Sequence, residues 1–251
     1  MFSVSAVLAL LAAGPLQAEE QGRLAFVACP IVQDTPTVPC WLVEYQGKTY
    51  YMGIQTDVSA PFNPPSLGHK VLVEGTPTDR EICGAQVIEP IRISIIPELS
   101  PECDELRMAR PGVDLGFDPP RPPGPSRGRL AFDYLDPPPV PQAPFAVRNF
   151  TVDYDFEGMV GFRTPRILQP ALEYAQQSKA SRLEVTGFRG ATRLSDGKLL
   201  EEHAGIARER AEEIVRMFRG AGLDTEFVIR AGDEAIEGGP ENRKVDIRIV
   251  P

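Results

Sequence analysis

The stretch Leu183-Glu-Val-Thr-Gly-Phe-Arg-Gly190 begins with alternating apolar and polar residues, a pattern typical of a half-buried strand, and it predicts a strand over residues 183–186. An upstream strand is predicted where four apolar or aromatic residues alternate with polar ones, namely Phe150, Val152, Tyr154 and Phe156. Downstream, two more alternating strands are expected, marked by Phe227 and Ile229 and by Val245, Ile247 and Ile249. The last hundred residues therefore contain four predicted strands.

Two amphipathic helices are expected between these strands. The first follows Pro165 and carries a recurring apolar face of Ile167, Leu168, Ala171, Leu172 and Ala175. The second covers residues 201–218, is ended by Gly220 and Gly222, and has an inner face of Ala207, Ala211, Ile214, Val215 and Phe218. The pairs Glu201-Glu202 and Glu212-Glu213 are interpreted as solvated faces of this helix. The order β-α-β-α-β-β predicts a two-layer sandwich of helices on a mixed sheet.

Three motifs in this region resemble the core motifs of the OmpA-like C-terminal domain family: residues 183–190, Ile206-Ala-Arg-Glu-Arg-Ala211 and Asn242-Arg-Lys-Val245. The resemblance covers about residues 150–251, within a domain expected over residues 148–251, and implies an OmpA-like fold that binds peptidoglycan in a Gram-negative cell envelope. The ligand implied is diaminopimelate in the peptide stem. An aspartate accepts hydrogen bonds from its ammonium group, and an arginine donates two parallel bonds to its carboxylate.

The resemblance places Arg210 on the family arginine, and Asn242 and Arg243 on the asparagine-arginine signature. Thr186 and Gly187 match the Thr-Gly that ends the family's second strand. The His-Thr-Asp that follows in the family is replaced by Phe188, Arg189 and Gly190, and His203 stands where an asparagine is usual. The family aspartate is therefore missing, which puts ordinary diaminopimelate binding in doubt.

The candidate peptidoglycan-binding residues are thus Arg210, Asp196, Asn242, Arg243, Thr186 and Gly187. Asp196 lies in a Ser195-Asp196-Gly197 turn within a long loop predicted over residues 188–205, and it either supplies the missing carboxylate or serves only as a turn residue. Arg210 either faces the ligand groove or pairs on the surface with Glu209 or Glu213. Asn242 and Arg243 either touch the ligand or support loop packing.

Residues 19–103 are predicted to form a small all-β domain. Short β-branched or aromatic runs mark five strands, at residues 23–28, 41–45, 48–52, 70–74 and 91–96, and Gln46-Gly47 is a hairpin signal between two of them. Five strands of this kind suit either an OB-like barrel or another small β fold. The fold class expected for the whole chain is α+β, with this domain, a Pro-rich linker and the C-terminal two-layer sandwich.

Four cysteines, Cys29, Cys40, Cys83 and Cys103, lie in this domain. An even number in a chain that carries an export signal favours two disulfides. Of the three possible connectivities, the local pairs Cys29 with Cys40 and Cys83 with Cys103 are favoured because each closes a short loop. A zinc site is the competing interpretation, but the chain has no C-x-x-C pair and only two histidines.

Residues 1–18 are interpreted as a cleaved secretory signal, because an apolar run ends in Pro15-Leu16-Gln17-Ala18. The run is preceded by no Lys or Arg, so an uncleaved anchor is the alternative. Residues 104–147 form a Pro-rich linker, either a semi-rigid polyproline spacer or a ligand for a Pro-recognising module. The expected location is the periplasm or the outer-membrane periphery.

A net charge of −9 argues against a nucleic-acid partner, and no run of 18 apolar residues follows the signal, so no integral membrane span is expected. G-x-S-x-G, H-E-x-x-H and phosphate-binding glycine motifs are missing, which predicts a non-enzyme without cofactor or metal. Two functions remain open. The chain associates non-covalently with peptidoglycan, or it is an envelope scaffold or protein-interaction module that has lost diaminopimelate binding.

Overall fold

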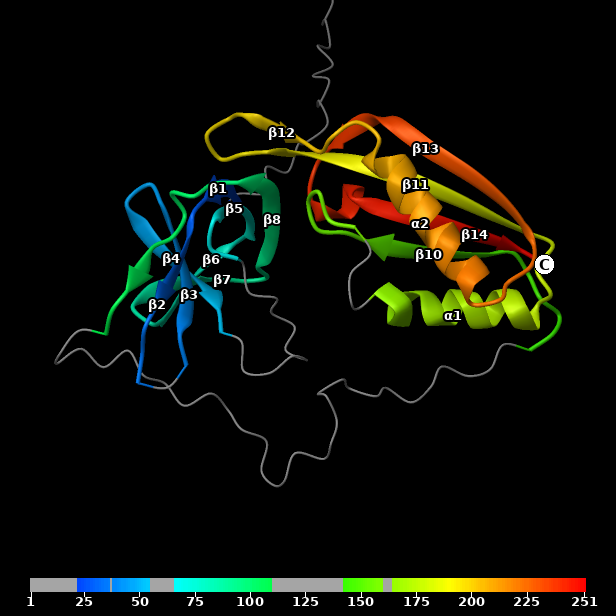
Figure 1. The fold of residues 1–251 in the computed structure, drawn as a ribbon, viewed down its shortest axis with the longest axis horizontal. Coiled ribbons are helices and arrows are strands. Elements are labelled where there is room, and N and C mark those ends of the chain that lie inside the picture. The colour runs from blue at the N-terminus through cyan, green and yellow to red at the C-terminus, as the bar shows by residue number, and fades with distance from the viewer. Residues whose placement is uncertain (1–21, 37, 55–65, 110–141, 160–163) are drawn as a thin grey trace, which may run out of the picture.

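The computed structural model describes residues 22–36, 38–54, 66–109, 142–159 and 164–251. Within these segments the chain forms fourteen strands in three sheets, together with two α-helices (Figure 1). The predicted signal at residues 1–18 and the greater part of the predicted Pro-rich linker, residues 110–141, lie outside the described residues.

The expected fold class is wrong. The described residues are mostly strand, in three sheets, and do not amount to an α+β protein with an OmpA-like two-layer sandwich. The difference arises in both halves of the chain. The N-terminal half contains more strands than its sequence pattern marks, and in the C-terminal half a predicted loop is replaced by paired strands.

The N-terminal half contains two sheets. A three-stranded antiparallel sheet has the order β1-β5-β8, from Leu24–Ala28, His69–Gly75 and Arg92–Leu99. A six-stranded sheet has the order β6-β7-β4-β3-β2-β9, from Pro77–Ile82, Ala85–Ile88, Lys48–Gly53, Cys40–Tyr45, Pro30–Gln33 and Leu106–Arg107. Phe26, Val43, Tyr50, Val71 and Ile88 are among the buried residues that pack together between the strands.

The five strands predicted in this half correspond to β1, β3, β4, β5 and β8, but four further strands are present in the described residues. These are β2, β6, β7 and β9, and they are short or polar. Strand β6, for example, has the sequence Pro-Thr-Asp-Arg-Glu-Ile and is mostly exposed. Such an edge strand lacks the apolar alternation on which the prediction depends, so the expected number of five strands is too low.

The disulfide pairing also differs from the expected local pairs. The bonds join Cys29 to Cys103 and Cys40 to Cys83, across sequence separations of 74 and 43 residues. Parallel pairing of β2 with β9 brings the chain near Cys103 beside Cys29, and parallel pairing of β4 with β7 places the β6–β7 turn, which holds Cys83, near β3. Strand pairing between distant segments therefore decides the connectivity.

Two disulfides are compatible with an exported protein. In the part of the chain that is described, neither helix is both long enough and apolar enough to cross a membrane.

The C-terminal half is a five-stranded sheet with two helices. Its elements in chain order are β10 Arg148–Asp153, α1 Thr164–Gln177, β11 Arg182–Arg193, β12 Leu199–Glu201, α2 Ile206–Gly220, β13 Glu226–Glu237, the 3-10 helix η1 Pro240–Asn242, and β14 Lys244–Val250. The strand order is β10-β14-β11-β12, with β13 paired to the other side of β11 in parallel. The four predicted strands and both predicted helices are present, although the second helix begins at Ile206 and not at Glu201.

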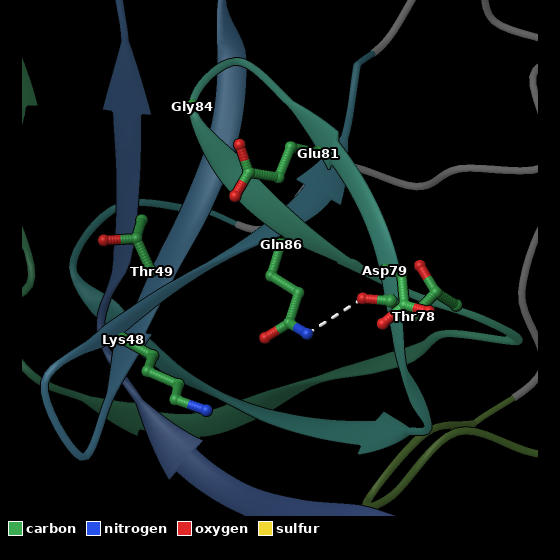
Figure 2. Close-up of a pocket in the computed structure, with 7 residues that line it drawn as sticks. All are labelled: Lys48, Thr49, Thr78, Asp79, Glu81, Gly84 and Gln86. Atoms are coloured by element: carbon green, nitrogen blue, oxygen red, sulfur yellow. Dashed lines mark hydrogen bonds between the residues drawn. The ribbon is translucent and has the colours of Figure 1, made fainter.

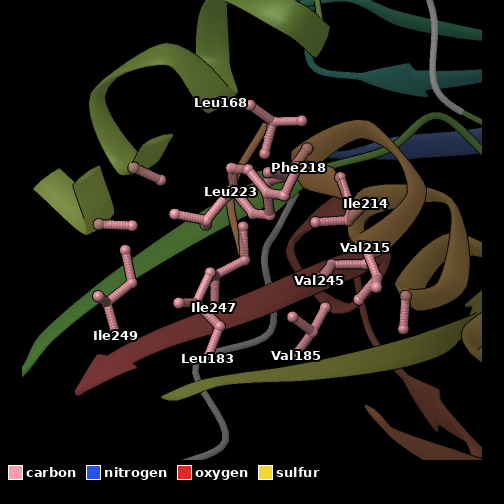
Figure 3. Packing of buried hydrophobic residues seen from close by; sticks show 14 of the residues in the cluster. Leu168, Leu183, Val185, Ile214, Val215, Phe218, Leu223, Val245, Ile247 and Ile249 are labelled. Carbon is pink, nitrogen blue, oxygen red and sulfur yellow. The ribbon is translucent and has the colours of Figure 1, made fainter. Parts of the chain in front are cut away.

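Helices α1 and α2 pack against one face of this sheet (Figures 1 and 3). The buried side chains between them include Leu183, Val185, Ile247, Ile214 and Phe218. The predicted alternation of β11 and β14 and the predicted inner face of α2 supply this core, because every second strand residue points to the same side of a sheet.

The predicted loop at residues 188–205 is largely a β-hairpin. Strand β11 continues through Gly187 to Arg193, turns at Ser195-Asp196-Gly197, and pairs antiparallel with β12. Gly187 lies where β11 passes closest to α2. A Cβ atom built on it would lie 1.8 Å from the carbonyl oxygen of Ala207 in α2. Glycine at this position therefore sets the distance between helix and sheet.

Gly187→Ala is expected to destabilise the fold by about 1–3 kcal/mol or more, because the added methyl meets backbone that cannot rotate away. Gly220→Ala, where nothing lies within 4 Å of the new Cβ, is the matched control and should be neutral or slightly stabilising. Urea unfolding followed by circular dichroism measures both changes. Equal urea midpoints for the two variants would show that α2 moves away from the new methyl group without loss of stability.

Candidate functional site

Arg210 lies on the inner face of α2, among the buried residues Ile206, Ala207, Ala211 and Ile214. The residues one helical turn before and after it are apolar and contact the core, so helix periodicity directs Arg210 inward as well. Its side chain is 0% exposed. A buried guanidinium requires a counter-charge and acceptors for its five N–H groups.

The counter-charge is Glu202, from the segment between β12 and α2, whose side chain is also 0% exposed. The pair is bidentate. Arg210 Nη2 donates to Glu202 Oε1 at 2.6 Å, and Nη1 donates to Oε2 at 3.0 Å. Two backbone N–H groups also donate to this carboxylate. The N–H of Glu157 donates to Oε1 at 2.9 Å, and the N–H of Gly190 donates to Oε2 at 2.7 Å. Glu202 thus accepts four hydrogen bonds.

The other donors of Arg210 reach backbone carbonyls. Nε donates to Gly158 at 2.9 Å, Nη2 to Asp155 at 3.1 Å and Nη1 to Phe188 at 3.4 Å. The guanidinium carbon lies 4.6 Å from the centre of the Tyr154 ring, within the range of a cation–π contact. Burial raises the pKa of Tyr154, and the Arg210 charge acts in the opposite direction. The guanidinium has no donor left for an external ligand.

His203 and Glu157 border this buried pair. The backbone N–H of His203 donates to Glu157 Oε1 at 2.5 Å, and its Nε2 lies 3.4 Å from Glu157 Oε2. Burial raises the pKa of Glu157, opposed by the hydrogen bond from His203. The His203 side chain is 47% exposed, so it forms the outer rim of the cluster.

A second buried ion pair connects the two halves of the chain. Arg243 Nη2 donates to Glu74 Oε2, and both side chains are 1% exposed. Arg243 Nη1 and Glu74 Oε1 each lie within hydrogen-bond distance of Thr192 Oγ1, at 3.4 and 3.5 Å. Arg23 Nη2 is 4.0 Å from Glu74. Glu74 belongs to β5 and Arg243 directly precedes β14, so this pair is part of the contact between the halves.

Further hydrogen bonds join the halves on either side of that ion pair. Ser195, in the β11–β12 turn, pairs with Ala25 of β1 through its N–H at 2.7 Å and its Oγ at 3.0 Å. The N–H of Phe156 donates to Ser94 Oγ of β8 at 2.9 Å. Three different segments of the C-terminal half therefore contact the three-stranded sheet.

The remaining candidate residues do not gather around Arg210. Asp196 accepts a hydrogen bond from the Lys198 N–H at 3.0 Å and pairs with the Lys198 ammonium at 3.0 Å, contacts that lower its pKa. Asn242, the last residue of η1, donates to the carbonyl of Glu237 at the end of β13 at 3.3 Å. Thr186 is half-buried in β11, and Gly187 approaches α2. Of these candidate residues, Gly187 is the one that contacts the helix holding Arg210, and the carbonyl of the adjacent Phe188 accepts a hydrogen bond from Arg210.

Glu202 and Glu74 are the two site residues that the sequence did not reveal. Glu202 was interpreted as part of a solvated helix face, but it precedes α2 and is buried. Its neighbour Glu201 lies in β12 and pairs with Arg189 at 3.0 Å. The only signal was indirect, since an arginine at an inward helix position needs a buried acid somewhere in the fold.

A surface pocket of about 470 Å³ lies on the N-terminal half, lined by Lys48, Thr49, Thr78, Asp79, Glu81, Gly84 and Gln86 (Figure 2). Gln86 Nε2 donates to the Thr78 carbonyl across it at 2.8 Å. The lining carries charges of both signs and no nucleophile beside a base. In the described residues, no three His, Cys, Asp or Glu side chains converge in a way that could hold a metal ion.

The chain as a whole was also compared with known proteins. No protein-family model, curated protein or solved structure matches it.

Proposed function

We propose that this chain is a non-catalytic scaffold or protein-interaction module of the cell envelope, and that Arg210 maintains its structure without binding the wall. The observation that carries this proposal is the saturation of Arg210 by Glu202 and three backbone carbonyls at 0% exposure. The resemblance to OmpA-like domains implies an arginine that grips a ligand carboxylate. Here a carboxylate of the chain itself takes that place.

Wall binding through this site would require Glu202 to leave. If Glu202 moved away, its carboxylate would lose four hydrogen bonds. The buried guanidinium of Arg210 would then have no counter-charge until the ligand bound. The acid that could replace the family aspartate, Asp196, is engaged by Lys198 in the hairpin turn. Both observations favour the interaction module over the wall anchor.

The envelope location rests on the predicted signal together with the two disulfides. Protein contact is supported by three large apolar side chains that are strongly exposed in the N-terminal half, Leu99 at 77%, Leu106 at 62% and Met108 at 73%. They lie close together in sequence, on both sides of the disulfide-bonded Cys103.

Sedimentation with insoluble peptidoglycan sacculi tests the proposal. The mature chain is expected to stay in the supernatant, whereas an OmpA-like protein that retains the family aspartate should sediment under the same conditions. Saturable sedimentation of the wild-type chain would overturn the proposal. Asp196→Ala is included because loss of such binding in this variant would show that the turn supplies the missing carboxylate.

A photo-crosslinking residue placed at Met108 tests the protein contact directly. We expect it to give a discrete adduct in the envelope, while the same residue at the exposed Lys48 should not. No adduct from Met108, or the same adduct from both positions, would argue against a contact by this segment.

A further inference from the structure

Strand β13 forms one edge of the C-terminal sheet. It is 12 residues long, Glu226-Phe-Val-Ile-Arg-Ala-Gly-Asp-Glu-Ala-Ile-Glu237, and in the described part of the chain its only paired neighbour is β11 (Figure 1). The backbone N–H and C=O groups on the outer side of such a strand can pair with another strand. The edge is longer than the average strand of a globular protein.

The two faces of β13 have different surroundings. Phe227 and Ile229 pack against the hydrophobic core under the helices. The register with β11 sets Val228 beside Glu184 and Arg230 beside Thr186, which alternate with the core residues Leu183 and Val185 and so lie on the face away from the helices. Beyond a shift in the register, Ile236 lies beside Gly190. Glu234 is two residues before Ile236, within the segment where the register with β11 shifts. Arg230, Glu234 and Ile236 are exposed.

Three of the five residue pairs placed symmetrically about Gly232 within β13 are complementary, while the other two set Ala231 against Asp233 and Phe227 against Glu237. Two residues to either side are Arg230 and Glu234, which have opposite charges; three to either side are Ile229 and Ala235; and four to either side are Val228 and Ile236, which are apolar. When two such strands run antiparallel with Gly232 opposite Gly232, each of these residues lies opposite its complement and on the same face.

Some charged residues at or near this edge already have partners, and Glu237 of β13 pairs with Arg193. On the same open face, Arg248 pairs with Glu184 and Lys244 pairs with Asp246. By contrast, neither Arg230 nor Glu234 takes part in an ion pair within the part of the chain that the structure describes. The opposite charges of these two residues therefore remain available to a strand that adds to the edge.

We propose that β13 pairs antiparallel with β13 of a second copy of this chain, about a two-fold axis through Gly232. This axis stands perpendicular to the sheet, so the two sheets become one and the helices of both copies lie on the same side. Arg230 of each copy faces Glu234 of the other, and Val228 faces Ile236. Gly232, without a side chain, lets the strands approach at the axis. The dimer does not depend on the proposed function.

The same edge also has features that, in other proteins, prevent edge strands from pairing between molecules. The register of β13 against β11 shifts between Gly187 and Arg189, so four steps along β13, from Ala231 to Ala235, match two along β11. Bulges and charges of this kind can prevent edge pairing. They would not, however, place opposite charges and matching apolar residues symmetrically about one glycine, and charge reversal separates the two explanations.

The test is a charge swap followed by light scattering on size-exclusion chromatography and by sedimentation velocity across a concentration series. The wild type is expected to be a dimer. Arg230→Glu and Glu234→Arg each set like charges opposite one another twice, and each should raise the dimer dissociation constant by about tenfold or more. The double variant Arg230→Glu/Glu234→Arg restores both pairs and should return the dimer.

Arg216→Glu, at an exposed position of α2, is the charge-matched control and should leave the dimer unchanged. Gly232→Cys tests the axis itself, because opposite residues of antiparallel strands lie within the Cα separation that a disulfide requires. An intermolecular crosslink should appear on a non-reducing gel. A wild-type monomer at every concentration, or a dimer that neither single reversal weakens, would overturn the proposal.

Discussion

Arg210→Ala is expected to lower the free energy of unfolding by about 3–5 kcal/mol, because it leaves the carboxylate of Glu202 buried without a counter-charge. The two backbone N–H groups that remain, from Glu157 and Gly190, do not neutralise it. Arg210→Lys should restore little of the loss, since one ammonium cannot reproduce a bidentate pair together with three carbonyl contacts. Urea unfolding followed by circular dichroism gives the difference.

Two further variants show whether the charge itself matters. The double change Arg210→Met/Glu202→Leu removes both charges at similar volume and should recover part of the stability that either single change loses. The recovery stays incomplete because two backbone N–H groups and three carbonyls lose their partners. Arg208→Ala, on the same helix, removes a residue that is 61% exposed and 3.9 Å from Glu212, and it should cost about 1 kcal/mol or less. If Arg210→Ala matched Arg208→Ala, the buried pair would have no structural role.

Glu74→Ala and Arg243→Ala are each expected to destabilise the chain by about 3–5 kcal/mol and to uncouple its two halves. Glu74→Ala leaves Arg243 buried without its counter-charge, and Arg243→Ala leaves Glu74 with only Arg23 at 4.0 Å, at the contact between the three-stranded sheet and the C-terminal sheet. The single tryptophan, Trp41, reports on the N-terminal half, and both described helices lie in the C-terminal half. Tryptophan fluorescence and helical circular dichroism therefore follow the halves separately.

In the wild type the two signals should change at the same urea concentration, as in a cooperative transition. In Glu74→Ala they should separate. Arg80→Ala is the control, because it breaks an exposed ion pair in the N-terminal half, with side chains 59% and 52% exposed, and should leave both midpoints nearly unchanged. Coincident and unshifted transitions in Glu74→Ala would mean that the remaining hydrogen bonds hold the halves together without the ion pair.

The candidate site was only partly predictable. The motif around Arg210 singled out a residue with an unusual environment, and the structure places that residue at the centre of a buried cluster. The sequence could not reveal that Glu202 pairs with Arg210 in this buried cluster. A glutamate beside another glutamate at a predicted helix start is ordinarily solvated, and only the hairpin of β11 and β12 turns Glu202 inward.

The second arginine shows the same limit more strongly. The sequence pattern around Arg243 indicates either a ligand contact or support for loop packing. Its counter-charge, Glu74, is 169 residues away in sequence and belongs to the other half of the chain. No local pattern connects them, because the pairing depends on how the two halves dock.

Local sequence patterns predict the elements that depend on neighbours along the chain. These elements are five strands of the N-terminal half, four of the C-terminal half, both helices and the inward face of α2, because alternation and helical periodicity are local properties. The tertiary structure alone decided the polar edge strands, the hairpin, both disulfide pairings and the partners of Arg210 and Arg243. Each of these depends on distant segments meeting in space, where burial forces charges and cysteines to pair with whatever the fold brings beside them.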